Sequence, residues 1–174
     1  MSLTARSIQT ALSDALLNSV EIAAQCLEYF GTGHSVSAGG SGRQGNTEAP
    51  SFAVLVWSRT AGEDDPERVI EASILLTITD ATFITKTEPM SIPGEVGEDP
   101  SEVDVELVTY GGPEKLETLL ELAAAEILSL SSEIMISELS YNFEPLEYFP
   151  LFVGGIDFTV TYPVLIGGYE PELS

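Results

Sequence analysis

Basic residues are scarce in this chain of 174 residues: six lysines and arginines face 28 aspartates and glutamates, for a formal net charge of −22 at pH 7. They are scattered one at a time, at Arg6, Arg43, Arg59, Arg68, Lys86 and Lys115. Proteins that bind nucleic acid or anionic lipid need clustered positive charge near the phosphates. The composition therefore argues against nucleic-acid binding through a basic patch and against attachment to an anionic membrane.

Histidine and cysteine are scarcer still, because His34 and Cys26 are the single examples of each. One cysteine allows no intramolecular disulfide, and one histidine with one cysteine is too few for a zinc-type site. Cys26 lies in an apolar helical pattern, so we expect a small buried side chain. His34 lies in a glycine-rich segment, where we expect a solvent-exposed loop residue rather than a member of a catalytic triad.

Long apolar runs are missing from the start of the chain. The first 20 residues carry one arginine and no apolar stretch long enough for a signal sequence or a membrane span. We expect a soluble protein that is made in the cytoplasm and has no membrane partner.

The hydrophobic content of 44% is ordinary and suffices for one core, so a single domain over residues 1–174 is expected. Apolar spacings of three and four predict one helix over residues 3–30 and a second after Pro113 that ends near Ser131. The first buried stripe comprises Ile8, Leu12, Ala15, Leu16, Val20, Ala23, Leu27 and Phe30. The second comprises Leu116, Leu119, Leu120, Ala123, Ala124, Ile127 and Leu130.

Several segments have the composition of strands. Residues 51–58 are apolar on both faces and predict a central, doubly covered strand, with residues 69–85 as its antiparallel partner. Residues 103–111 predict a half-buried strand with an acidic outer face, and residues 138–146 a further strand. The fold class expected is α+β, with a mostly antiparallel sheet of about four to five strands packed against two main helices.

The apolar segment at 155–166 predicts a strand that backs the core, because Ile156, Phe158, Val160 and Tyr162 share one face. Gly154 and Gly155 indicate a bend or bulge before this strand. Pro163 cannot donate to a neighbour, so pairing is expected to stop there or to lie at a sheet edge.

Two segments are predicted to be loops, a mobile glycine-rich loop at 31–49 and an acidic, proline-rich loop at 87–102. Within the first, GSGRQGNT at 40–47 has the spacing of a phosphate-binding loop, but Asn46 replaces the required lysine and a helix, not a strand, precedes it. The acids of the second lack the ligand pattern of a helix-loop-helix calcium site. We therefore predict no catalytic, cofactor or metal site, and a protein that is not an enzyme.

The order of these elements resembles the tail terminator (tail completion) proteins of long-tailed bacteriophages. The segments that carry the resemblance are an N-terminal helix, the strands APSFAVLVW and ASILLTITD, the helix PEKLETLLELAAAEIL and the closing strand GGIDFTVTYPV. The resemblance implies a structural virion protein, localised in the viral tail, that forms a hexameric ring and performs no catalysis. Its implied partners are copies of itself, the tail tube protein and the head connector or neck protein.

DNA would pass through such a ring without specific binding, and carboxylates facing the lumen would repel its phosphates. The candidates for this role are Glu95, Glu98, Asp99, Glu102, Asp104 and Glu106. The last strand's edge, or the C-terminal residues 167–174, would contact a neighbouring subunit.

Four alternatives stay open. Another head-tail joining or neck ring protein would share size and oligomerisation, and an enzyme with a carboxylate-only site would show a deep pocket converging on two acids. An acidic DNA-mimic inhibitor should concentrate acids along one continuous face, whereas in the sequence they fall in loops and on both helices. The acidity is also compatible with adaptation to a salty environment, whatever the function.

Overall fold

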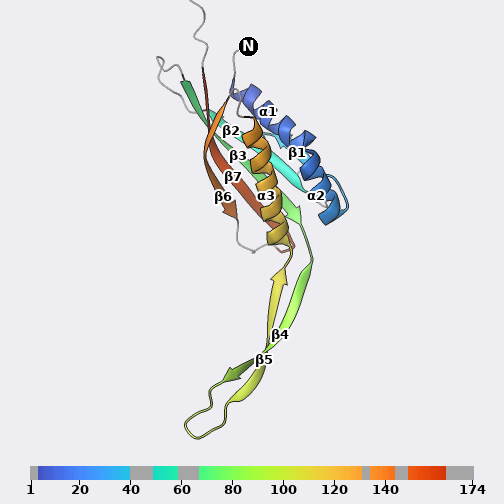
Figure 1. The fold of residues 1–174 in the computed structure, drawn as a ribbon, viewed down its shortest axis with the longest axis vertical. Helices are drawn as coiled ribbons and strands as arrows, with labels where there is room; N and C mark the ends of the chain where they lie inside the picture. The colour runs from blue at the N-terminus through green and yellow to red at the C-terminus, as the bar shows by residue number, and fades with distance from the viewer. Residues whose placement is uncertain (1–3, 40–48, 59–66, 131–133, 144–148, 164–174) are drawn as a thin grey trace, which may run out of the picture.

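The computed structural model describes residues 4–39, 49–58, 67–130, 134–143 and 149–163 (Figure 1). These residues form three helices, a mixed five-stranded sheet and a separate two-stranded antiparallel sheet, so the predicted α+β class is confirmed. The helices are α1 (Ala5–Asn18), α2 (Val20–Phe30) and α3 (Gly112–Ser129). The strands are β1 (Ser35–Ala38), β2 (Ser51–Ser58), β3 (Glu67–Thr79), β4 (Phe83–Ile92), β5 (Ser101–Tyr110), β6 (Met135–Phe143) and β7 (Leu151–Pro163).

The five-stranded sheet has the order β1-β2-β3-β7-β6. Only β1 and β2 run parallel, and the predicted antiparallel pairing of residues 51–58 with the following strand is confirmed. Strand β7 lies between β3 and β6, so the prediction that the last strand offers an edge is wrong. The alternative contact through residues 167–174 lies outside the described residues. The two long strands β3 and β7 pair over thirteen residues each and form the centre of the sheet.

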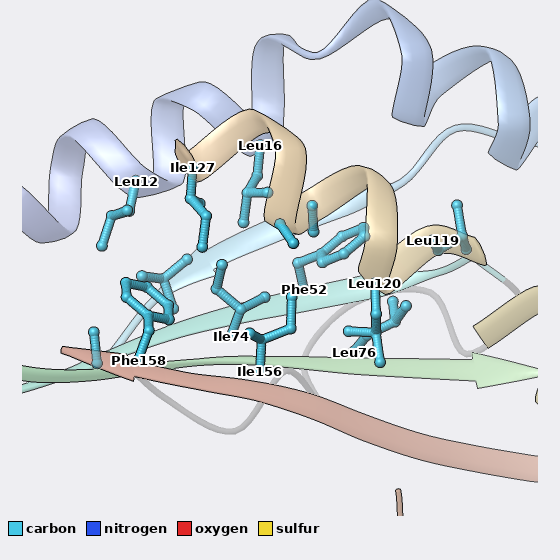
Figure 2. Close-up of a cluster of buried hydrophobic side chains, with 14 of the residues drawn as sticks. Leu12, Leu16, Phe52, Ile74, Leu76, Leu119, Leu120, Ile127, Ile156 and Phe158 are labelled. Atoms are coloured by element: carbon cyan, nitrogen blue, oxygen red, sulfur yellow. The ribbon is translucent and has the colours of Figure 1, made fainter. Parts of the chain in front are cut away.

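The three helices lie together on one face of this sheet (Figure 1). Helix α1 packs against β1 and β2, and α3 packs against β3 and β7. Figure 2 shows the resulting core, in which Leu12 and Leu16 of α1 and Ile127 of α3 lie over side chains of the central strands. The predicted inward face of β7 is confirmed, because Ile156, Phe158, Val160 and Tyr162 are all buried.

The single helix predicted over residues 3–30 is wrong, because the chain breaks at Ser19 into α1 and α2. Ser19 has an extended backbone, and its hydroxyl accepts from the Ile22 backbone N–H as the N-cap of α2. The same hydroxyl donates to Glu126 of α3 across 2.5 Å. A serine that caps a new helix satisfies donors that would otherwise be orphaned.

The break changes which side chains of the second segment are buried. Ile22 and Cys26 of α2 are fully buried, which confirms the expectation for the cysteine. Val20 and Leu27, predicted to be in the buried stripe, are 79% and 62% exposed. The stripe of a continuous helix therefore does not carry over into α2.

Close contact between α3 and the sheet depends on glycines. A Cβ atom at Gly112 would lie 2.2 Å from the ring of Phe152, and one at Gly154 would lie 3.0 Å from Leu116. The bulge predicted at Gly154 and Gly155 is instead in β6, between Ser137 and Ser140. The two glycines of β7 pair regularly with β3 and form no bulge. Because they have no side chain, they let side chains of neighbouring elements approach the strand closely.

Other sequence predictions also need correction. Residues 31–49 are not all loop, since β1 lies within them, while the motif at 40–47 lies outside the described residues. Strand β2 is not covered on both faces, because Trp57 on the face opposite the helices is 52% exposed. The strand predicted over residues 69–85 is interrupted after Thr79, and its end belongs to β4.

Candidate assembly surface

Strands β4 and β5 form a long hairpin that projects away from the helices and the five-stranded sheet (Figure 1). They pair antiparallel over ten residues each, from Phe83 with Tyr110 to Ile92 with Ser101. Ten residues of extended chain span about 30 Å. The acidic, proline-rich loop predicted at 87–102 is therefore only half right, because residues 93–100 form the turn of this hairpin but residues 87–92 and 101–102 belong to its two strands.

Proline did not prevent strand formation here because β4 has a single neighbour. Pro89 pairs in register with Asp104 of β5, and the other side of β4 has no partner strand in the described chain. A strand with one free side tolerates a residue that lacks an N–H donor.

One face of the hairpin is apolar. Side chains alternate between the two faces of a strand, and cross-strand partners share a face. The register places six apolar side chains together, all of them exposed: Ile84, Met90, Ile92, Val103, Val105 and Leu107. We call this set the apolar hairpin face; the strand predicted over 103–111 does alternate as expected, but its apolar side meets no core.

Charge on the apolar hairpin face is limited to one ion pair. Lys86 and Glu88 lie on this face and contact each other, and both side chains are mostly exposed. The pair adds no net charge. In a chain with a net charge of −22, this is an uncharged surface on an acidic protein.

The opposite face of the hairpin carries acids. Glu102, Asp104 and Glu106 alternate along β5 and are exposed, with Thr85, Thr87 and Ser91 beside them on β4. We call these three acids the acidic hairpin face. The other predicted acids, Glu95, Glu98 and Asp99, are exposed in the turn at the tip. All six acids proposed from the sequence are thus brought to one projecting element, three of them in a row.

The base of the hairpin is fixed by an ion pair whose carboxylate is buried and whose ammonium group is partly exposed. Lys115 of α3 contacts Asp80 across 2.8 Å, and Asp80 accepts from the Thr82 backbone N–H and hydroxyl. The Gly111 N–H donates to the Thr82 carbonyl, which closes the end of the hairpin. Burial by itself would raise the pKa of Asp80, but Lys115 and Thr82 stabilise the carboxylate and hold that pKa below its ordinary value.

Lys115 also ties the hairpin base to α2. Its ammonium group lies 5.9 Å from the ring centre of Tyr29 and 5.6 Å from that of Phe30. Cation–π contacts of this length are attractive. The hairpin base, the start of α3 and the end of α2 therefore share one cation, and the sequence offers no spacing signal that would have revealed this.

The sheet face away from the helices carries a polar cluster. A shallow depression there is lined by Trp57, Glu71, Ser73, Glu138, Asp157 and Thr159, among others. Asp157 accepts from the Ser73 hydroxyl and from the Asn142 amide, while Glu138 accepts from Thr159 across 2.8 Å. These hydrogen bonds give the cluster a structural explanation, and it is not the deep pocket that a carboxylate-only enzyme would need.

His34 is not the exposed loop residue predicted. Its ring is partly buried, Nε2 donates to the Leu16 carbonyl across 2.8 Å, and the ring meets Phe52 edge-on. Leu16 lies in the last turn of α1, and its carbonyl also accepts from the Ser19 backbone N–H across 3.4 Å. His34 thus supports the end of α1. Within the described residues, no group of three His, Cys, Asp or Glu side chains is arranged to hold a metal ion.

Comparison with protein-family models and with curated proteins finds no match for this sequence. No helix in the described ranges is both long and apolar enough to cross a bilayer. Function is therefore inferred from the geometry of the hairpin and from the resemblance in element order.

Proposed function

We propose that the protein is a tail terminator of a long-tailed bacteriophage, a structural subunit without catalytic activity or cofactor. In this role copies of the chain assemble into a ring, six in the family that it resembles. The ring caps the tail tube and joins it to the head connector in the virion.

The observation that carries the proposal is the apolar hairpin face. An isolated two-stranded hairpin is marginally stable in water unless another element packs on it. Contiguous exposed apolar surface on a soluble protein marks an interaction site. A hairpin that extends from the body with its apolar side uncovered is suited to packing on another subunit.

The acidic hairpin face supports the same role. If the apolar side of each hairpin packs on a subunit, Glu102, Asp104 and Glu106 remain on the opposite side. Carboxylates that line a hole repel the phosphates of DNA, which allows DNA to move without sticking. The acids would then line the lumen, as expected from the sequence.

Negative-stain electron microscopy with light scattering tests the proposal. The purified protein is imaged at high concentration, with and without magnesium, while its mass in solution is measured. We expect rings with a central hole and a mass that is a multiple of the monomer. Compact particles without a hole would contradict the proposal.

Charge neutralisation tests the lumen assignment. Glu102→Gln, Asp104→Asn and Glu106→Gln together should leave rings intact but reduce DNA delivery by assembled tails. The matched control removes the same charge from exposed positions of α3, by Glu114→Gln, Glu117→Gln and Glu121→Gln. Equal DNA delivery by both triple variants would contradict the lumen assignment. Neutralising all six acids of the hairpin without any effect would contradict it further.

A DNA-mimic inhibitor is the second candidate, and one observation favours it. The acids that seemed scattered in sequence form a row of three on β5, with three more at the tip. Alternate residues of a strand are about 6.6 Å apart, so this row is a regular array of negative charge. Competition with DNA for a nuclease tests it: inhibition by the wild-type protein that is lost in the β5 triple variant would favour the mimic. A mimic leaves the apolar hairpin face unexplained.

A neck ring protein would share both faces of the hairpin. Binding to purified tail tubes distinguishes a terminator, which should bind them, from a neck ring protein.

A further inference from the structure

A second exposed apolar surface lies on the outer side of α2. Val20, Ala24 and Leu27 follow the helical spacing of four and three, so they form one stripe, and all three are exposed. We call them the α2 outer stripe. Glu21 and Glu28 lie beside the stripe on the helix surface, one helical turn or less away.

The two apolar surfaces do not meet within one chain. The hairpin extends away from the helices (Figure 1), and β4 and β5 contact mainly each other. No helix among the described residues packs on the hairpin to a comparable degree. Among the described residues, no element of the same chain covers either surface, so both are open to another molecule.

The surfaces match in size, and their charges do not oppose contact. Val103 to Leu107 on the hairpin spans about 13 Å and Val20 to Leu27 on the helix about 10 Å. Lys86 and Glu88 leave the apolar hairpin face without net charge, so the two glutamates that flank the α2 outer stripe would meet a neutral surface and not another acidic one. A helix laid on a sheet face is also the usual way in which a two-stranded sheet is stabilised.

We infer that the apolar hairpin face of one copy packs on the α2 outer stripe of a second copy. The inference rests on the proposed function in that both require self-assembly, and it names the surfaces that meet. Because the two surfaces differ, the contact is heterologous. Where the contact is not reciprocated within a two-fold pair, its repetition closes into a ring or continues as a filament.

Disulfide trapping between single-cysteine variants tests the contact. Val105→Cys on the hairpin and Val20→Cys on α2 are made in a Cys26→Ala background, mixed at high concentration and oxidised. We expect the mixture to give a cross-linked dimer on a non-reducing gel and either variant alone to give little. Thr87→Cys, on the opposite hairpin face, is the matched control and should not link to Val20→Cys.

The outcomes separate this inference from the proposed function. Self-linking of Val105→Cys alone would show hairpin-to-hairpin pairing and overturn the inference. Rings in the micrographs without mixed cross-links would overturn the contact and leave the ring proposal standing. Monomers by light scattering with no cross-link would overturn both.

A double variant distinguishes a ring from a filament. A chain carrying both Val20→Cys and Val105→Cys should give a ladder of covalent oligomers that ends at the number of subunits in the ring. A ladder without an upper limit would confirm the contact but contradict the terminator proposal. Absence of any ladder would overturn the contact.

Discussion

Cys26 is fully buried on α2, and burial raises the pKa of its thiol to about 11. The thiolate is the reactive form, so we predict that a thiol reagent at mildly alkaline pH labels the folded protein at least ~100-fold more slowly than the denatured protein. Absorbance of the released chromophore with and without denaturant measures both rates. Rapid stoichiometric labelling of the native protein would contradict the burial of this side chain.

Gly112 is the residue whose replacement should cost most at the α3–sheet contact. A Cβ atom there would overlap the Phe152 ring, so we predict that Gly112→Ala lowers the free energy of unfolding by about 1–3 kcal/mol. The matched control is Gly33→Ala, where a Cβ atom meets nothing within 4 Å, with an expected change within about 0.5 kcal/mol. Urea unfolding compares them, and equal midpoints would show that α3 can shift to make room.

Among the elements, the hairpin base gives a pH-dependent prediction. The carboxylate of Asp80 has a lowered pKa in the folded state, so its contribution to stability is present above the ordinary aspartate pKa near 4. That contribution is lost as pH falls through the lowered folded pKa. We predict that Lys115→Met costs about 3 kcal/mol at neutral pH, because it leaves the buried carboxylate without its cation.

The measurement is the urea midpoint at neutral pH and near pH 2. The difference between wild type and Lys115→Met should shrink at the lower pH, because protonation of Asp80 removes the negative charge that Lys115 balances. Lys86→Met is the control, since its ion pair with Glu88 is exposed and should change stability by less than about 1 kcal/mol. A constant difference across pH would mean that Lys115 acts through packing on Tyr29 and Phe30 alone.

The elements that the sequence predicted best are those whose pattern reflects the core of the same chain. The stripe Leu116 to Ile127 of α3 and the alternation Ile156 to Tyr162 of β7 are buried as expected. The break at Ser19 was missed because both sides of it continue a helical spacing. Because the apolar spacing of three and four residues continues on both sides of Ser19, that spacing does not reveal that Ser19 ends one helix and caps the next.

The hairpin was missed for a different physical reason. Pro89, Pro93 and Pro100 suggest an irregular loop, yet Pro93 and Pro100 are the first and last residues of the turn and Pro89 lies in a strand with one neighbour. The alternation of Val103, Val105 and Leu107 was recognised, but alternation cannot tell whether the apolar side faces its own core or another molecule. The six acids and the alternation of Asp104 and Glu106 were identified from the sequence; what the sequence did not specify is that this strand pairs with residues 83–92 in a projecting hairpin.

For the whole molecule, the net charge of −22 predicts that salt stabilises the fold. Self-repulsion destabilises a compact acidic chain, and added ions screen it. We predict that about 1 M sodium chloride raises the thermal midpoint by about 3 °C or more relative to low salt. Calorimetry measures the shift, and the α3 triple variant, with three fewer charges, should show a smaller one. A midpoint that falls with salt would mean that attractive ion pairs outweigh repulsion.

The base of the hairpin also sets how its length can vary among related chains. Phe83 and Tyr110 are paired neighbours, so the segment between them can lengthen or shorten while the body is unchanged. Insertion of one residue in one strand, without a bulge, would turn that strand's side chains beyond it to the other face and mix the apolar and acidic faces. Homologues should therefore differ in this segment by an even number of residues per strand, a pattern that an insertion library selected for function would also reproduce.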